Sequence, residues 1–302
     1  MDKFCDIFCH GFDNLILAFG LGYRRNIKNA KSLDVLSFGI FLLNLTVVLF
    51  FYLHHLFHSK VFFSNDALSK LTDIVELSLP ILVHILTIMC ALGNRRKNHR
   101  IIAQQMDIDK VLKSLNPDAF RKTKTRAVLT FILKSFVIHF IGIGFETFMM
   151  ISLTPGNLDW RNSWVARLFS NNALRMCDSL YLYYCDYLSS RLSFFNQELT
   201  RMSFEKQDQL EWPFLNKLKV LKAIDLKIFQ LSNDVRDYFK YFLLANISSY
   251  IMIIVIDVYW IYASLLFRTN PYDLRKFTQY PWHIIVWFTF IFQNPTSVLG
   301  RK

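Results

Sequence analysis

Charged residues are scarce in this chain, and their scarcity excludes an ordinary soluble globule. Only 19% of the 302 residues are Asp, Glu, Lys or Arg, whereas 53% are hydrophobic and the mean hydropathy is +0.26. Soluble domains carry about 25% charged residues on average. The composition therefore predicts a membrane protein.

Cysteine pairs at disulfide or zinc spacing are lacking as well. The five cysteines are odd in number, and the one short-range group of metal-ligand residue types is Cys5, Cys9 and His10, which we do not interpret as a metal site. The chain also lacks a Gly-rich phosphate loop, an H-E-x-x-H motif and a G-x-S-x-G motif. We therefore expect no metal, no cofactor and no enzymatic activity.

A cleavable signal peptide is not recognisable, because acidic residues interrupt the apolar positions near the start of the chain. We expect the first membrane span to begin insertion. The net charge of +12 would suit a nucleic-acid surface, but the basic residues lie between apolar runs. We interpret them as solvated linkers and expect no nucleic-acid partner.

Windows of about 20 apolar residues predict six membrane spans. They cover residues 36–57, 71–92, 127–150, 164–188, 241–267 and 277–293. Pro80 interrupts the second span, and the sixth has only a short apolar core, WHIIVWFTFIF. We therefore expect an all-α, multi-pass transmembrane helical bundle that forms a single domain over residues 1–302.

The fourth predicted span is unusually polar. At 100° per residue its ionisable and amide side chains fall within one stripe about 100° wide. The members of the stripe are Arg167, Asn171, Arg175, Asp178 and Asp186. Such a stripe is expected to face protein or water rather than lipid.

Lysine and arginine alternate between rich and poor linkers. Their numbers are five before the first span and then two, ten, one, nine and three in the successive linkers. By the positive-inside rule the amino terminus and the second and fourth linkers are cytoplasmic. The two N-glycosylation sequons, at Asn44 and Asn246, fall inside predicted spans, where no glycosylating enzyme reaches them.

The fourth linker, residues 189–240, keeps apolar residues at helical spacing. The predicted buried positions are Leu188, Leu192, Phe195 and Leu199, followed by Leu218, Leu221, Ile224, Ile228 and Leu231. We therefore expect the fourth and fifth helices to continue into the cytoplasm and to pack together there.

Two segments carry a resemblance to a known family. LSSRLSFFNQEL (residues 188–199) and residues 220–266 resemble the end of the fourth helix and the fifth helix of the insect gustatory receptors, a branch of the insect chemoreceptor superfamily. The resemblance implies a subunit of a tetrameric, ligand-gated cation channel, formed with identical or related subunits. It also implies detection of small tastants at the plasma membrane of sensory neurons.

The family's seventh helix, which lines the ion pathway, contains a signature of Thr-Tyr followed by apolar residues and Gln that this sequence does not show. The chain ends instead at NPTSVLGRK. We expect the seventh helix to be lacking, and a truncated isoform, a disrupted gene and a gene-model error each explain such an end. A non-conducting or modulatory subunit of the same family is therefore an alternative.

Ligand contacts are expected from polar and aromatic groups in the outer halves of the spans, because a small extracellular molecule needs hydrogen-bond partners and ring faces there. The candidates are Glu76, Glu146, Asn171, Arg175, Asp178, Asp257, Tyr259 and Trp282. Neutralisation of Arg175 by Asp178 within one helix is the competing interpretation.

Arg191 and Asn196 belong to the motif that carries the resemblance, which implies packing between subunits. Attraction of the nearby lysines to anionic lipid is the alternative. A G-protein-coupled receptor is a more distant alternative for the whole chain, but it requires an extracellular amino terminus, against the charge pattern.

Overall fold

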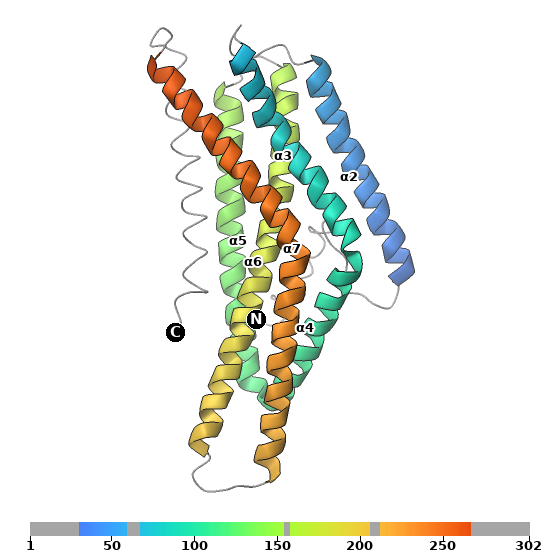
Figure 1. The fold of residues 1–302 in the computed structure, drawn as a ribbon, viewed down its shortest axis with the longest axis vertical. Coiled ribbons are helices and arrows are strands. Elements are labelled where there is room, and N and C mark those ends of the chain that lie inside the picture. Colours follow the sequence, from blue (N-terminus) through green and yellow to red (C-terminus); the bar gives the residue numbers. More distant parts are fainter. Residues whose placement is uncertain (1–29, 59–66, 154–157, 206–211, 267–302) are drawn as a thin grey trace. The chain divides into compact units, whose positions relative to one another are not determined.

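Six helices make up the described part of the chain in a computed structural model, which covers residues 30–58, 67–153, 158–205 and 212–266 (Figure 1). The helices are α2 (Ala30–His58), α3 (Ala67–Gly93), α4 (Arg95–Leu115), α5 (Pro117–Leu153), α6 (Leu158–Glu205) and α7 (Trp212–Leu266). These residues contain no strand. The prediction of an all-α bundle is confirmed, whereas the predicted sixth span, 277–293, lies outside the described residues.

The first two predicted spans lie within α2 and α3. Pro80 is inside α3 and is buried, and the helix continues through it. Membrane helices tolerate such a proline because neighbouring groups satisfy the freed carbonyl. The sequon residues Asn44 and Asn246 are 7% and 2% exposed, in agreement with their predicted inaccessibility.

The second linker is more ordered than the sequence analysis predicted. We interpreted residues 93–126 only as a charged linker, but they form all of α4 and the beginning of α5. The buried residues of α4 share one helical face, with Ile101, Ile108 and Leu112 each at 0% exposure. This amphipathic face explains why a chain segment rich in charge still folds as a helix.

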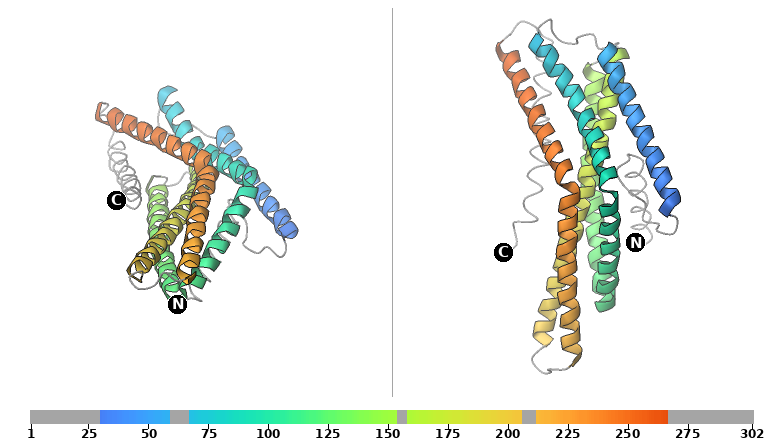
Figure 2. Two further views of the ribbon diagram at one scale, coloured as in Figure 1. Left: turned by 60° about the horizontal axis from the view of Figure 1, so that its bottom comes forward. Right: turned by 45° about the vertical axis from the view of Figure 1, so that its right-hand side comes forward.

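Helices α6 and α7 are continuous over 48 and 55 residues. At 1.5 Å per residue they are about 70 Å and about 80 Å long, more than twice the thickness of a hydrocarbon core. Residues 187–205 of α6 and 212–239 of α7 run side by side in the views of Figures 1 and 2. The predicted helical extension of the fourth and fifth spans is therefore confirmed.

The predicted buried face is correct for α7 but is shifted on α6. Leu221, Ile224, Ile228 and Leu231 are buried as expected. On α6, however, Leu192 is 45% exposed. The buried positions lie one residue earlier: Tyr187, Arg191, Phe194 and Glu198. Leu218 of α7 is also exposed, at 40%, and was predicted to be buried.

The helices divide into two compact units. Unit 1 contains the described residues within Met1–Asn44, Thr87–Phe140 and Arg175–Tyr241, and unit 2 those within Leu45–Leu86, Ile141–Leu174 and Phe242–Lys302. Aromatic rings of α6 and α7 pack in unit 1, where Phe239 lies 5.3 Å from Tyr181 and 5.8 Å from Tyr184 between ring centroids. In unit 2, Val48 and Ile81 form a small apolar core.

Two segments of the described residues are long and apolar enough to cross a membrane, Pro117–Gly144 and Leu215–Ile256. A third is possible if Ser78–Gly93 and Arg95–Leu115, which are bent by 67° with respect to each other, count as one broken span. Helix α2 contributes a shorter apolar segment, Phe38–Phe50. These helices agree with the membrane class that the composition predicts.

Candidate functional site

Half of the predicted ligand contacts can be located with their side chains. Asn171, Arg175 and Asp178 lie on α6 and Tyr259 lies on α7. Asp178 is 7% exposed, the other three are half-buried, and each of the four already interacts with a neighbour. The side chains of Glu76, Glu146 and Asp257, and all of Trp282, lie outside the described residues.

The polar stripe of α6 faces protein, as predicted. Arg167 and Asp178 are buried, and Asn171, Arg175 and Asp186 are half-buried, so none of the five points fully outward. Burial of these groups away from lipid is what lets so polar a helix belong to a membrane protein.

One polar group of unit 1 joins α5 to α6. The imidazole Nε2 of His139 lies 3.0 Å from the hydroxyl oxygen of Ser179, and the guanidinium of Arg175 is close enough to act electrostatically on His139. Five residues earlier on α5, the Lys134 ammonium donates to both carboxylate oxygens of Asp186, at 3.0 and 3.1 Å. Arg175 therefore belongs to a fixed group of polar side chains.

A second polar group, in unit 2, was missed by the sequence analysis. His84 of α3 is 0% exposed, and its Nδ1 lies 3.3 Å from the hydroxyl oxygen of Ser170 on α6. Its ring packs against Phe169, 5.6 Å between centroids, and Phe169 in turn packs on the core of Val48 and Ile81. We call His84, Phe169 and Ser170 the His84 cluster.

The second ring nitrogen of His84 is the chemically notable atom of this cluster. Nε2 is buried and has no hydrogen-bond partner within the described part of the chain. A buried nitrogen without a hydrogen-bond partner destabilises the fold unless water or a ligand group forms that hydrogen bond. The only sequence signal was a histidine inside an apolar run, which by itself does not reveal a partner on another helix.

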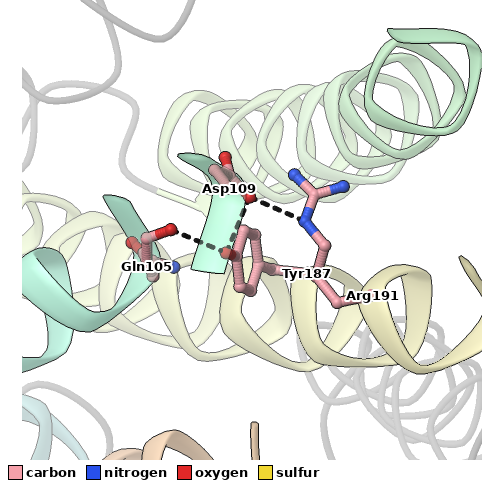
Figure 3. A network of polar contacts seen from close by, with 4 residues as sticks. All are labelled: Gln105, Asp109, Tyr187 and Arg191. Atoms are coloured by element: carbon pink, nitrogen blue, oxygen red, sulfur yellow. Dashed lines mark hydrogen bonds and ion pairs between the residues drawn. The ribbon is translucent and has the colours of Figure 1, made fainter. Parts of the chain in front are cut away.

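The motif residue Arg191 lies at the centre of a network between α4 and α6 in unit 1. Its side chain is 3% exposed, and Nε donates to Asp109 Oδ1 at 2.8 Å. The hydroxyl of Tyr187 lies 2.9 Å from the same oxygen and 3.1 Å from the carbonyl oxygen of Gln105 (Figure 3). Figure 3 shows Asp109 reaching from α4 between the two α6 side chains.

Two aromatic rings complete the environment of Arg191. The guanidinium carbon lies 4.7 Å from the ring centroid of Phe120 on α5 and 4.7 Å from that of Tyr187. Desolvated cation–π contacts of this kind are worth about 2 kcal/mol. Arg191 thus packs α4, α5 and α6 of one chain together, whereas Asn196 is exposed. Contact of either residue with another subunit stays a prediction.

Asn116 ties the turn between α4 and α5 to α6. Its Oδ1 accepts from the backbone N–H of Ala119 at 3.2 Å, which caps α5, and its Nδ2 donates to Glu198 at 2.9 Å. The Glu198 side chain is 5% exposed and is also 3.6 Å from Arg201. The end of unit 1 around the turn between α4 and α5 is therefore held by directional polar contacts.

Among the side chains that the structure describes, no group of three or more His, Cys, Asp or Glu residues could hold a metal ion. The chemistry available is hydrogen bonding and charge recognition inside apolar helices, which suits the binding of a small polar molecule.

Comparison with known proteins places the chain in a family. No curated protein matches the sequence significantly. The sequence pattern of one protein family, described as 7tm Chemosensory receptor, matches residues 23–298, which is most of the chain. Buried polar groups within long apolar helices agree with a membrane protein that recognises chemical signals, and the chain belongs to the 7tm chemosensory receptor family.

Proposed function

We propose that this chain is a taste receptor subunit, a ligand-gated cation channel that detects small tastants at the plasma membrane of sensory neurons, and that it is not an enzyme. The observation that carries the proposal is the family match over residues 23–298. The buried ionisable and hydrogen-bonding side chains of α3, α5 and α6 support it, because such groups are costly inside membrane helices and, where they occur, commonly mark binding or conduction sites.

The proposed ligand contacts are the predicted residues with His84 added. They are Glu76, His84, Glu146, Asn171, Arg175, Asp178, Asp257, Tyr259 and Trp282. A polyhydric or amine-bearing tastant offers the donors, acceptors or positive charge that these side chains complement. Ligand binding opens the channel only in so far as the ligand binds the open state more tightly than the closed state.

Assembly of several subunits is supported by the outward face of α7. Leu226 and Phe229 are 57% and 64% exposed. Since α7 is continuous, Phe229 lies twelve residues, or about 18 Å, before the start of the predicted fifth span at Tyr241. Lipid tails do not reach that far beyond the predicted span, and a pair of large exposed apolar side chains suits contact with another protein surface. We propose that it is a further subunit of a homo- or hetero-tetramer.

The channel proposal is tested by expressing the full chain in cells that lack other chemoreceptors and recording current during application of sugars, amines and bitter compounds. Arg175→Gln should weaken the current evoked by the active compound. Lys110→Gln, which also removes one positive charge but at an exposed position on α4, should not. Current that appears only with a co-expressed relative would assign a modulatory role. A G-protein-dependent response without current would contradict the channel.

The assembly proposal is tested by Phe229→Glu, which places a charge in the exposed apolar face of α7. Gln230→Glu is the matched control, because it adds the same charge at an exposed neighbouring position without removing an apolar side chain. We expect native mass measurements to show loss of the tetramer for Phe229→Glu alone. Equal effects of both changes, or of neither, would contradict packing through this face.

A further inference from the structure

Three contacts define one common level across the four helices of unit 1. Each joins a different pair of helices, and each is 3.0 to 3.1 Å between donor and acceptor. The contacts are Gln104 with Asp234 (α4 to α7), Tyr187 with the carbonyl oxygen of Gln105 (α6 to α4) and Lys134 with Asp186 (α5 to α6). We call these residues the contact level.

Exposed cations lie just beyond this level, on the side toward residue 92, where the second predicted span ends, and residue 241, where the fifth begins. The level crosses α5 and α6 at Lys134 and Asp186, inside the predicted third and fourth spans, so a headgroup boundary at these cations shortens both spans relative to the sequence prediction. Arg96 and Arg100 are four to eight residues before Gln104 on α4, and Arg236 and Lys240 are two to six residues after Asp234 on α7. At 1.5 Å per residue all four lie within about 12 Å of the contact level. We call these four residues the basic belt.

The surface changes character immediately after the belt. Tyr241 follows Lys240, is 57% exposed, and has its ring centroid 4.9 Å from the Lys240 ammonium. Farther along α7 the exposed side chains are apolar, including Leu244 and Ile247 at 65% and 55%. An aromatic residue between basic and apolar surface is typical of the boundary between headgroups and hydrocarbon.

The belt cations are only weakly neutralised by the protein. The Arg100 side chain is 66% exposed and lies 3.9 Å from Asp234, a carboxylate that already accepts from Gln104. Arg236 is 71% exposed and lies 3.7 Å from its neighbour Asp237. Exposed pairs at such distances contribute little, so the guanidinium groups can exchange these partners for stronger anions.

We propose that the basic belt binds the headgroups of anionic phospholipids in the inner leaflet. A phospholipid presents a phosphate next to an acyl chain. Along α7 the protein presents complementary surfaces in the same order, with cations first, then Tyr241 and then an apolar helix surface. An acidic protein would match the cations but not the apolar surface beside them. Basic residues just cytoplasmic of a membrane helix attract anionic lipid strongly enough to select it.

The test compares lipid selectivity of the full chain in phosphatidylcholine bilayers, measured as the association of spin-labelled phosphatidylserine relative to spin-labelled phosphatidylcholine. We expect about a five-fold preference for phosphatidylserine, the effect of roughly one well-placed cation at the surface. The fourfold variant Arg96→Gln, Arg100→Gln, Arg236→Gln, Lys240→Gln should reduce the preference to less than about two-fold.

The matched control removes four exposed lysines that lie on the opposite side of the contact level from the belt. They are Lys110 and Lys113, after Gln104 on α4, and Lys122 and Lys124, ten to twelve residues before Lys134 on α5, each changed to Gln. This control should keep the preference. The wild-type chain provides a test that needs no variant, because high salt should abolish an electrostatic preference. Soluble glycerophosphoserine should compete poorly if the lipid is the ligand. No wild-type preference, equal loss in the control, or full competition by the soluble headgroup would each overturn the proposal.

Discussion

Two buried polar side chains, Arg191 in unit 1 and His84 in unit 2, are held in very different ways. Arg191 has a carboxylate at 2.8 Å and an aromatic ring on two sides, although its buried Nη1, like Nε2 of His84, has no hydrogen-bond partner among the described residues. His84 has one hydroxyl at 3.3 Å and one nearby ring, and its Nε2 has no partner among the described residues. The contacts of Arg191 hold its side chain in one geometry, whereas the His84 ring can exchange its hydrogen-bond partner with a small change in free energy.

This difference separates two tasks within one receptor subunit. A charged network that packs three helices suits a part that must keep its shape, because removal of any partner leaves a buried charge uncompensated. A histidine with an incomplete set of hydrogen bonds suits a part that must respond, since a ligand group can supply the bond that the protein omits. Mutations that separate stability from response test this comparison.

The largest effect is expected from Asp109→Ala. The change leaves Arg191 buried without its counter-ion, at a cost of about 3 kcal/mol, the lower end of the range for buried pairs because Asp109 is 28% exposed. The melting temperature of the purified chain should fall clearly, whereas Asp225→Ala at an exposed site should leave it nearly unchanged. The double change Asp109→Leu with Arg191→Met should recover much of the loss. Similar melting of both single variants would contradict the role of the network.

The second effect concerns Asn116→Ala, which removes the cap of α5 and the donor to Glu198. Loss of a cap costs about 1 kcal/mol, and a buried carboxylate without its donor costs about 1 kcal/mol more. Hydrogen exchange at the start of α5 should increase, and Asn116→Ser, which keeps a capping oxygen, should have roughly half the effect on stability. Asn196→Ala, at an exposed amide, serves as the control. Unchanged exchange in Asn116→Ala would show that the cap is unimportant.

The buried face of α7 could be predicted from sequence because its pattern is local. Leu221, Ile224, Ile228 and Leu231 repeat at helical spacing and pack on neighbours whatever those neighbours are. The same reasoning failed on α6, since Arg191 and Glu198 are buried by partners 82 residues away, Asp109 and Asn116. No window along the chain contains both members of such a pair.

Helix α4 and the His84 cluster show two different limits. Ile101, Ile108 and Leu112 of α4 carry a helical pattern, but the surrounding charge concealed it when the segment was assessed only as a linker. His84, by contrast, had no pattern to detect, because its significance depends on Ser170 of another helix. Membership of the chemosensory family was nevertheless predictable, since residues 188–199 and 220–266 carry degenerate family motifs and the charge pattern alternates along most of the chain.

A smaller effect on stability is expected from His84→Leu. The change removes a buried polar atom that is already incompletely bonded, so the cost should be about 1 kcal/mol, and the added change Ser170→Ala should reduce it further. The response to the active tastant should nevertheless change by an order of magnitude or more if Nε2 contacts the ligand. Melting curves and dose–response curves of the same variants measure both quantities. A loss of stability as large as that of Asp109→Ala would abolish the distinction between the two clusters.

The smallest effect is expected from Lys227→Gln, which breaks an ion pair of unit 1 that lacks the burial of the Arg191 network. Lys227 donates to Asp107 at 3.3 Å, but the two side chains are 41% and 67% exposed. Water and salt screen such a pair, so the change should cost no more than about 0.5 kcal/mol, and even this should vanish at high ionic strength. The Asp109–Arg191 contact joins the same types of charge at a similar distance, yet the high-salt cost of Asp109→Ala should persist. Melting temperatures of both variants at low and high salt therefore show whether burial or charge alone accounts for the stability of the Arg191 network. An equal salt dependence of the two losses would mean that screened electrostatics alone holds this network.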